Sequence, residues 1–369
     1  MKVVVDEKIP YIQEAIKTIA DEVVYAPGNK FTPQLIKDAD ALIVRTRTKC
    51  NRELLEGSKV QFIATATIGY DHIDVGYCRD AGISWINAPG SNANSVAEYI
   101  ESCLALLLME HNLLLGEMKM GIVGVGNVGT LVARKAATFG MTVLENDPPR
   151  AAREGMNHFS SLQEIAEQCD IISFHTPLNM EGEYKTYHLA DEAFFRSLKK
   201  KPIIINTARG EVIDTEALLK AMDEEVVSTN AVIDVWENEP DINLDLLKRA
   251  YITTPHIAGY SADGKGNATR MALEGLCRHF HIDAKISIKL PRPRITAKSM
   301  LNSPDDIILL AYDPRKDTAR LKEKPGDFEE FRNNYPVRRE VEIYYQAWDK
   351  YVSNESTRKH NILDQKKRP

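Results

Sequence analysis

The chain has 369 residues, and its 43% hydrophobic and 27% charged residues exclude a disordered or fibrous protein and predict two or three domains. The longest apolar run, residues 103–109, is too short to span a membrane. The net charge of −6 argues against nucleic acid as the main partner. Five cysteines without a CxxC pair argue against a disulfide framework or a zinc site, and Asp6 stands too early for a signal peptide, so we expect a reduced, cytosolic protein.

Short β-rich runs alternate with helix-like stretches from the N-terminus onward, which is typical of a parallel α/β sheet. The first series is expected to contain a helix at 11–20 and strands at 3–6, 41–46 and 62–67. A long helix at 95–115 follows. Its all-round apolar middle predicts burial between two lobes.

A second strand series begins at Gly121, and helical stretches at 131–139, 162–168 and 215–222 separate most of its members. The expected strands are 121–124, 142–144, 171–174, 203–206, 231–234 and 251–253. Two α/β series in succession predict two doubly wound, Rossmann-like lobes. We expect a discontinuous lobe at 1–94 plus 261–286 and a second lobe at 95–260.

The composition changes at 290–294, where two prolines and two arginines predict a linker. Residues 287–369 contain 18 Lys and Arg against 13 Asp and Glu, which leaves −11 for residues 1–286. We expect a strand at 305–312, a polar helical region at 328–351 and a frayed last dozen residues. Charge alone leaves open whether this basic segment is an assembly module or a solvated surface.

A GxGxxG motif at 124–129 stands between a predicted strand and an apolar helix. Asp147 follows the last glycine by 18 residues, which is the distance typical of a ribose-binding acid in dinucleotide folds. In such folds the pyrophosphate lies at the glycine turn and at the N-terminus of the following helix. The motif therefore predicts dinucleotide binding, with Asp147 selecting NAD over NADP. Glu145 is a rival for that role, and a purely structural turn is the alternative.

Polar segments follow three later strands of the same series, as NTARG at 206–210, DVWENEP at 234–240 and TPHIAGY at 254–260. Each alone is compatible with an ordinary surface loop. The carboxyl ends of parallel strands meet at one edge of the sheet, however, so an arginine, a glutamate and a histidine are expected close together there.

With these motifs and an HTPL element at 175–178, residues 1 to about 285 resemble the D-2-hydroxyacid dehydrogenase family. The resemblance implies an NAD-dependent oxidoreductase. In it, Arg209 would clamp the substrate carboxylate, and His256 would take the hydroxyl proton as hydride leaves C2 for the nicotinamide. Glu239 would orient the imidazole and stabilise its protonated form, whereas Glu237 is expected to face solvent.

The resemblance also assigns binding residues. The expected contacts of NAD are Gly124, Gly126, Asn127, Val128, Gly129, Asp147, Thr176, Thr207, Ala208, Arg209, Asp234 and Gly259. Thr46, Thr67 and Tyr260 are expected at the substrate. Arg45 follows the predicted strand as Thr46 does. Because the acidic body cannot attract an anion by its overall charge, we expect Arg45 to bind a phosphate group.

Segments at 5–7, 44–46, 64–72 and 147–150 are similar to one subgroup of that family, and 311–317 and 336–340 resemble the subgroup's extra C-terminal domain. This resemblance implies oxidation of 4-phospho-D-erythronate to 3-hydroxy-2-oxo-4-phosphobutanoate for pyridoxal phosphate synthesis. It also implies a homodimer formed through a small α+β domain at 287–369. The alternatives are a family dehydrogenase acting on another acid, such as 3-phosphoglycerate, and an NAD-sensing corepressor.

Overall fold

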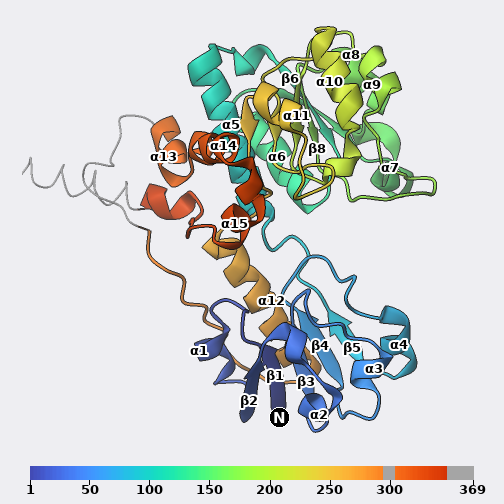
Figure 1. Ribbon diagram of the computed structural model, residues 1–369, viewed down its shortest axis with the longest axis vertical. Coiled ribbons are helices and arrows are strands. Elements are labelled where there is room, and N and C mark those ends of the chain that lie inside the picture. The colour runs from blue at the N-terminus through green and yellow to red at the C-terminus, as the bar shows by residue number, and fades with distance from the viewer. Residues whose placement is uncertain (294–303, 347–369) are drawn as a thin grey trace, which may run out of the picture. The chain divides into compact units, whose positions relative to one another are not determined.

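The structure is a computed structural model that describes residues 1–293 and 304–346. It divides into two compact units (Figure 1). The first contains residues 1–93 and 261–292, and the second contains residues 94–260 and the described residues from 293 onward. Each unit is built on one parallel sheet with helices on its faces, so the predicted pair of Rossmann-like folds is confirmed. In the described part of the chain, no helix combines the length and apolar character needed to cross a membrane.

The first unit has a five-stranded parallel sheet with the order β2-β1-β3-β4-β5. The strands are β1 (Lys2–Asp6), β2 (Glu22–Ala26), β3 (Ala41–Val44), β4 (Phe62–Thr65) and β5 (Ser84–Ile86). Successive residues of a strand point to opposite faces. Accordingly, Val3 and Val5 join one apolar cluster, and Val4 joins the other. A sheet covered on both faces explains why every residue of β3 and β4 is buried and all but Thr65 are apolar.

Five α-helices cover this sheet: α1 (Ile12–Ile16), α2 (Pro33–Ile36), α3 (Arg52–Leu55), α4 (Val75–Asp80) and α12 (Ala262–His279). The last of them, α12, follows residues 94–260 of the second unit in the sequence, yet it packs along β4 of the first unit (Figure 1). Its buried Leu273 and Leu276 belong to the same apolar cluster as Val3 and Val5. The first unit is therefore discontinuous in sequence.

The second unit has a six-stranded parallel sheet with the order β11-β10-β9-β8-β6-β7. The strands are β6 (Lys119–Val123), β7 (Thr142–Asn146), β8 (Ile171–Phe174), β9 (Ile203–Asn206), β10 (Val232–Ile233) and β11 (Ile252–Thr253). All six predicted strands are present, although β10 and β11 are shorter than expected. The chain runs from β6 to β7 and then crosses back to β8 on the other side of β6. The carboxyl ends of β6 and β8 therefore form the switch point where open α/β sheets bind ligands.

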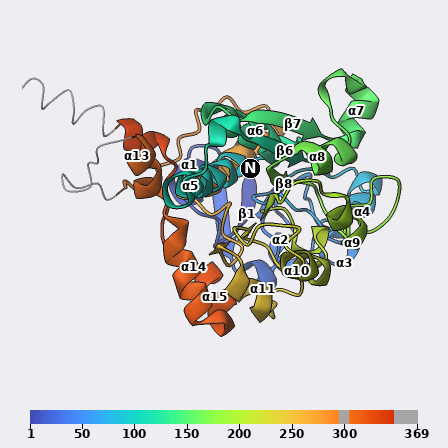
Figure 2. The same ribbon diagram turned by 90° about the horizontal axis from the view of Figure 1, so that it is seen from above.

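Helices lie on both faces of this second sheet (Figure 2). One face is covered by α5 (Ala93–His111) and α6 (Asn127–Thr138), whose apolar residues pack with Met120 and Ile122 of β6. The other carries α8 (Leu162–Gln168), α9 (Glu192–Ser197), α10 (Thr215–Asp223) and α11 (Leu244–Arg249), which pack with Val123. A short helix α7 (Pro148–Glu154) follows β7.

The described C-terminal segment, residues 304–346, packs onto the second unit. It contains α13 (Pro304–Ala311), α14 (Pro314–Glu323) and α15 (Phe328–Asn333), and no strand is assigned among these residues. Leu321 and Phe328 are 0% and 1% exposed within the unit's core, and the Thr318 hydroxyl accepts a hydrogen bond from the N–H of Thr253 in β11 (3.1 Å).

The strand predicted at 305–312 is wrong, because residues 305–311 belong to α13. Pro304 occupies the first helical position, which proline favours, and only one side of the apolar run is fully buried, with Ile307 and Ile308 at 2% and 6% exposed. Short apolar runs do not distinguish strand from helix by periodicity. The α+β dimerisation domain stays a prediction. The end of the region predicted at 328–351, residue 294 of the linker and the frayed last dozen residues lie outside the described residues.

Two carboxylates connect this segment to the start of α5. The Asn94 side-chain amide donates to Glu98 (3.0 Å) and to Glu340 (2.7 Å), and the N–H of Val341 donates to Glu98 (2.9 Å). Burial, together with the charge of Glu340, raises the pKa of Glu98 to about 8. Glu98 is therefore protonated in the folded chain at neutral pH.

This raised pKa predicts that the second unit loses stability as the pH rises. The folded chain keeps a proton on Glu98 that the unfolded chain releases above its ordinary pKa of 4.5, so the stabilisation is complete below pH 4.5 and is lost by about pH 8. Glu98→Gln should flatten this decline, which thermal denaturation between pH 5 and 8 would measure. The exposed Glu181→Gln is the control and should keep the wild-type slope. A Glu98→Gln slope equal to that of the wild type would contradict the prediction.

Candidate active site

The glycine-rich turn joins β6 to α6 at the switch point. Gly124 has a φ of +91°, a conformation that side chains disfavour. A Cβ on Gly129 would lie 2.0 Å from the Gly124 carbonyl oxygen, so only glycine lets α6 pack against the turn. A Cβ on Gly126 would meet open space, and Asn127 and Val128 begin the helix beside it. An anion is therefore expected at this helix N-terminus.

Asp147 lies next to this turn, at the end of β7. One carboxylate oxygen accepts the N–H of Val125 in the glycine turn (2.9 Å), and the other accepts the N–H of Arg150 (3.0 Å). The Arg150 guanidinium donates to the Val125 carbonyl (2.7 Å) and forms two hydrogen bonds with Glu154. The acid predicted to bind ribose is thus fixed against the turn predicted to bind pyrophosphate.

A cavity of about 340 Å³ opens beside these residues and is lined by Gly124, Asp147, Pro148, Thr176 and Tyr184 among others. The Thr176 hydroxyl is buried and has no hydrogen-bond partner in the described part of the structure. A cavity next to a glycine turn, with a carboxylate on its wall and a buried hydroxyl without a partner, fits the adenosine half of NAD.

Thr207 and Ala208 follow β9, the next strand of the sheet after β8. The Thr207 hydroxyl lies 3.4 Å from Nδ1 of His175, whose Nε2 lies 2.8 Å from the Ser173 hydroxyl. Burial lowers the pKa of His175 to about 3, so this imidazole remains neutral. His175 therefore links Ser173 of β8 to Thr207 after β9 as a neutral hydrogen-bonding group and adds no charge there.

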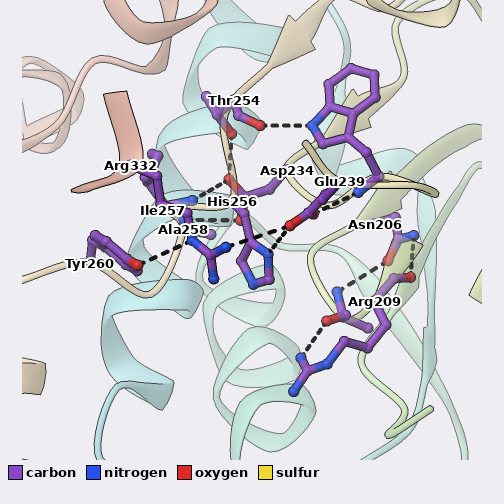
Figure 3. Close-up of polar contacts among 12 residues, drawn as sticks. Asn206, Arg209, Asp234, Glu239, Thr254, His256, Ile257, Ala258, Tyr260 and Arg332 are labelled. Atoms are coloured by element: carbon purple, nitrogen blue, oxygen red, sulfur yellow. Dashed lines mark hydrogen bonds and ion pairs between the residues drawn. The ribbon is translucent and has the colours of Figure 1, made fainter. Parts of the chain in front are cut away.

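His256 and Glu239 form a hydrogen-bonded pair, with His256 Nδ1 2.8 Å from a Glu239 oxygen (Figure 3). The other Glu239 oxygen accepts the N–H of Trp236 (3.0 Å). Burial raises the pKa of Glu239, but the hydrogen bond and charge of His256 outweigh burial and hold it below its usual value. The carboxylate is therefore ionised. The imidazole is held at Nδ1, and Nε2 has no hydrogen-bond partner among the described residues.

Asp234 fixes the loop that carries His256. Its carboxylate is 1% exposed and accepts the N–H groups of Ile257 (2.8 Å) and Ala258 (3.0 Å) and the hydroxyl of Thr254 (2.6 Å). Its carbonyl accepts the N–H of His256 (2.7 Å), which has a φ of +56°. Such a conformation is rare outside glycine and is kept only where several contacts impose it. This supporting role was not predicted from the sequence, and the NAD contact of Asp234 and Gly259 stays a prediction.

Arg209 is exposed at the carboxyl end of β9. Its guanidinium donates to the Ala208 carbonyl (2.7 Å), and its own carbonyl accepts from the Asn206 amide (2.9 Å). A Cβ on the next residue, Gly210, would lie 1.9 Å from the Trp236 carbonyl carbon, so the NTARG and WENEP loops are in direct contact. The structure thus places the Arg209 and Glu239 loops together, as predicted.

The predicted substrate residues Arg45, Thr46 and Thr67 belong to the first unit. They follow the paired strands β3 and β4, so they lie at one edge of that sheet. The Arg45 guanidinium donates to the Lys8 carbonyl (3.3 Å), and the Thr67 hydroxyl donates to the Gly69 carbonyl (2.8 Å).

Glu237 is placed differently from the prediction, and Arg332 makes a contact that the sequence did not predict. Glu237 does not face solvent: its side chain is 18% exposed, lies 2.7 Å from His188 Nε2 and accepts the N–H of Thr215 (2.8 Å). Arg332 of α15 donates to the Tyr260 hydroxyl (3.2 Å), and its Nη1 lies 3.7 Å from Glu239 (Figure 3). Sequence reasoning missed Arg332 because no motif marks it.

The family profile of the D-isomer specific 2-hydroxyacid dehydrogenase NAD-binding domain matches residues 109–258, and a domain of unknown function matches 289–356. An erythronate-4-phosphate dehydrogenase of Bacteroides fragilis is 60% identical over 344 residues, covering 93% of this chain and 98% of that protein. Its counterpart in Escherichia coli O81 is 42% identical over 95% of this chain and 94% of that protein.

Solved structures of similar fold include the D-lactate dehydrogenase of Aquifex aeolicus complexed with NAD and lactic acid. It has a TM-score of 0.58 and 27% identity and covers 76% of this chain and 96% of that one. The NAD⁺-bound 3-phosphoglycerate dehydrogenase of Entamoeba histolytica has a TM-score of 0.60 and 30% identity, covering 76% of this chain and 95% of that one.

Proposed function

Because the chain belongs to the erythronate-4-phosphate dehydrogenases of the D-isomer-specific 2-hydroxyacid dehydrogenase family, we propose that its reaction is the oxidation of 4-phospho-D-erythronate to (R)-3-hydroxy-2-oxo-4-phosphobutanoate. It is an NAD-dependent dehydrogenase, and its enzyme family belongs to pyridoxal 5′-phosphate biosynthesis. The observation that supports the chemistry best is the His256–Glu239 pair, which leaves one imidazole nitrogen open for the substrate.

In the proposed reaction, Arg209 holds the substrate carboxylate, since its planar guanidinium matches a planar acceptor. Nε2 of His256 accepts the proton of the C2 hydroxyl as the C2–H bond breaks and the carbonyl forms. Glu239 remains ionised and stabilises the resulting imidazolium. Bound NAD supplies the acceptor for the hydride from C2. The residues proposed to hold NAD are those around the 340 Å³ cavity and the glycine turn.

The assay that tests this function compares kcat/KM for three acids with NAD. These are 4-phospho-D-erythronate, 3-phosphoglycerate and unphosphorylated D-erythronate. The phosphorylated erythronate should be the best of the three by at least tenfold. Preference for 3-phosphoglycerate would instead favour the second dehydrogenase activity, and no turnover of any of them would favour a binding protein.

Glu239 and Glu237 offer a matched pair for testing the assignment of the carboxylate. Each is bonded to a histidine, at 2.8 Å and 2.7 Å, and each accepts one backbone N–H. Glu239→Gln should lower kcat by about tenfold or more, because the imidazolium loses its charged partner. Glu237→Gln should leave kcat within about twofold, and equal losses in the two variants would contradict the assignment.

We also propose that Arg45, with Thr46, Thr67 and Tyr260, contacts the substrate. Arg45→Ala should lower kcat/KM for 4-phospho-D-erythronate by roughly ten- to a hundredfold, since a charge-assisted contact contributes about 1.5–3 kcal/mol. Turnover of D-erythronate should barely change. Arg47→Ala removes the same charge from an exposed position two residues away and should have no effect. Equal losses on both substrates would show that Arg45 supports the fold.

Assembly as a cytosolic homodimer through the C-terminal segment is a further part of this proposal. The support for assembly is the resemblance of 311–317 and 336–340 to the subgroup's extra C-terminal domain. The support for the cytosol is the free thiols of five buried cysteines, which suit a reducing compartment. Sedimentation of the full chain should give twice the monomer mass, and a monomer would contradict the proposal.

A further inference from the structure

Arg332 is held next to the proposed reaction centre by the C-terminal segment. Phe328, four residues earlier on α15 and 1% exposed, anchors the helix in the core of the second unit. Residues four apart share one helix face, so this anchor also positions Arg332. The Arg332 side chain remains 34% exposed and reaches the Tyr260 hydroxyl at 3.2 Å (Figure 3). The ring of Tyr260 in turn meets the ring of Tyr335 edge-on.

The charge of Arg332 is only partly neutralised. A guanidinium has five N–H donors, and among the described residues only Nε of Arg332 forms a hydrogen bond, to Tyr260. Nη1 lies 3.7 Å from a Glu239 oxygen, which is too far for a hydrogen bond. Both oxygens of Glu239 already have their own partners, Trp236 and His256. In the described part of the chain, no other carboxylate lies within 4.0 Å of this guanidinium. Four donors are therefore available to an anion.

Arg332 and Arg209 lie on opposite sides of His256 (Figure 3). The proposed substrate has the same arrangement of charges, because its carboxylate lies on one side of the C2 hydroxyl and its phosphate, on C4, lies on the other. With Arg209 on the carboxylate and His256 on the C2 hydroxyl, this arrangement would direct C3 and C4 of the substrate toward the side of His256 on which Arg332 and Tyr260 lie.

We propose that Arg332, together with the Tyr260 hydroxyl, binds the phosphate group of the substrate in addition to the contact proposed for Arg45, and so makes the C-terminal segment part of substrate selection. This inference rests on the proposed oxidation of 4-phospho-D-erythronate. It gives a role in the active site to residues 289–356, which match a domain of unknown function. The competing interpretation is that Arg332 only positions Glu239 and Tyr260.

The test uses the full chain with saturating NAD. Arg332→Gln should lower kcat/KM for 4-phospho-D-erythronate by about ten- to a hundredfold, mainly through KM, and should change kcat/KM for D-erythronate by less than about threefold. Inhibition by inorganic phosphate should weaken to a similar extent. Arg332→Lys should recover part of the loss. Lys316→Gln, which removes a positive charge from an exposed position on α14, is the control and should match the wild type.

Two results would overturn the inference. Equal losses on the two substrates, with a shifted pH–rate profile, would assign Arg332 to positioning Glu239. Unchanged kinetics in Arg332→Gln would show that it has no role in turnover. Failure of the proposed function itself would be visible separately, because the wild-type chain would then fail to prefer 4-phospho-D-erythronate before any variant is compared.

Discussion

Replacing His256 with alanine should lower kcat by about 10²- to 10⁴-fold, the usual cost of losing a general base, while NAD binds nearly as well as before. The imidazole is the group proposed to accept the hydroxyl proton, and its bond to Glu239 fixes its orientation (2.8 Å). The glycine turn follows β6 and Asp147 follows β7, so the hydrogen bond between them should persist in this variant. Steady-state kinetics and a fluorescence titration of NAD would measure the two effects separately.

His188 is a close control for this substitution. It pairs with Glu237 at 2.7 Å and is 27% exposed, as is His256, and its partner is on the same loop as Glu239. His188→Ala should keep kcat within about threefold of the wild type. A comparable loss in both variants would indicate damage to the loop, and a His256→Ala enzyme with wild-type kcat would refute the proposed base.

Replacing Asp147 with alanine should weaken NAD binding by roughly ten- to a hundredfold, since hydrogen bonds to a charged acceptor contribute about 1.5–3 kcal/mol. The preference for NAD over NADP should also shrink. The carboxylate that would repel a 2′-phosphate is gone, and the Arg150 guanidinium remains next to the glycine turn (2.7 Å to the Val125 carbonyl). Dissociation constants of both cofactors, measured by titration, test the two effects.

Glu145→Ala is the matched control, because Glu145 is the rival acid, two residues earlier and within β7. Asp147 accepts two backbone N–H groups beside the cavity. We therefore expect Glu145→Ala to leave both affinities nearly unchanged. Normal NAD affinity in Asp147→Ala with a loss in Glu145→Ala would transfer the ribose contact to Glu145.

The strands of the second sheet and the inner strands of the first were predictable from the sequence, and the two edge strands of the first sheet were not. In β8 and β9 every residue is buried, and all but Ser173 and Asn206 are apolar, so both strands are marked by isoleucine-rich runs in the sequence. At the edges of the first sheet, β2 and β5 are half exposed and have no clean pattern. Residues 304–311 were predicted incorrectly because a short apolar run suits a buried helix as well as a strand.

The candidate site divides in the same way. Motifs at strand ends predicted the loops of Arg209, Glu239 and His256, because parallel topology brings such ends together. No motif in the sequence indicated the contacts between segments that lie far apart in the chain. Arg332 meets Tyr260 across 72 residues, and Glu237 turns inward to His188 across 49 residues. Both contacts depend on tertiary packing that no local pattern encodes.

The most direct test of the proposed reaction is a single turnover with 4-phospho-D-erythronate that carries deuterium at C2. Excess enzyme and NAD should convert it to one equivalent of the 2-oxo acid, with the deuterium in the reduced cofactor, as mass spectrometry of both products would show. His256→Ala should give neither product on the same timescale. A wild-type enzyme that transfers no deuterium from this substrate, yet transfers it from C2-deuterated 3-phosphoglycerate, would contradict the account.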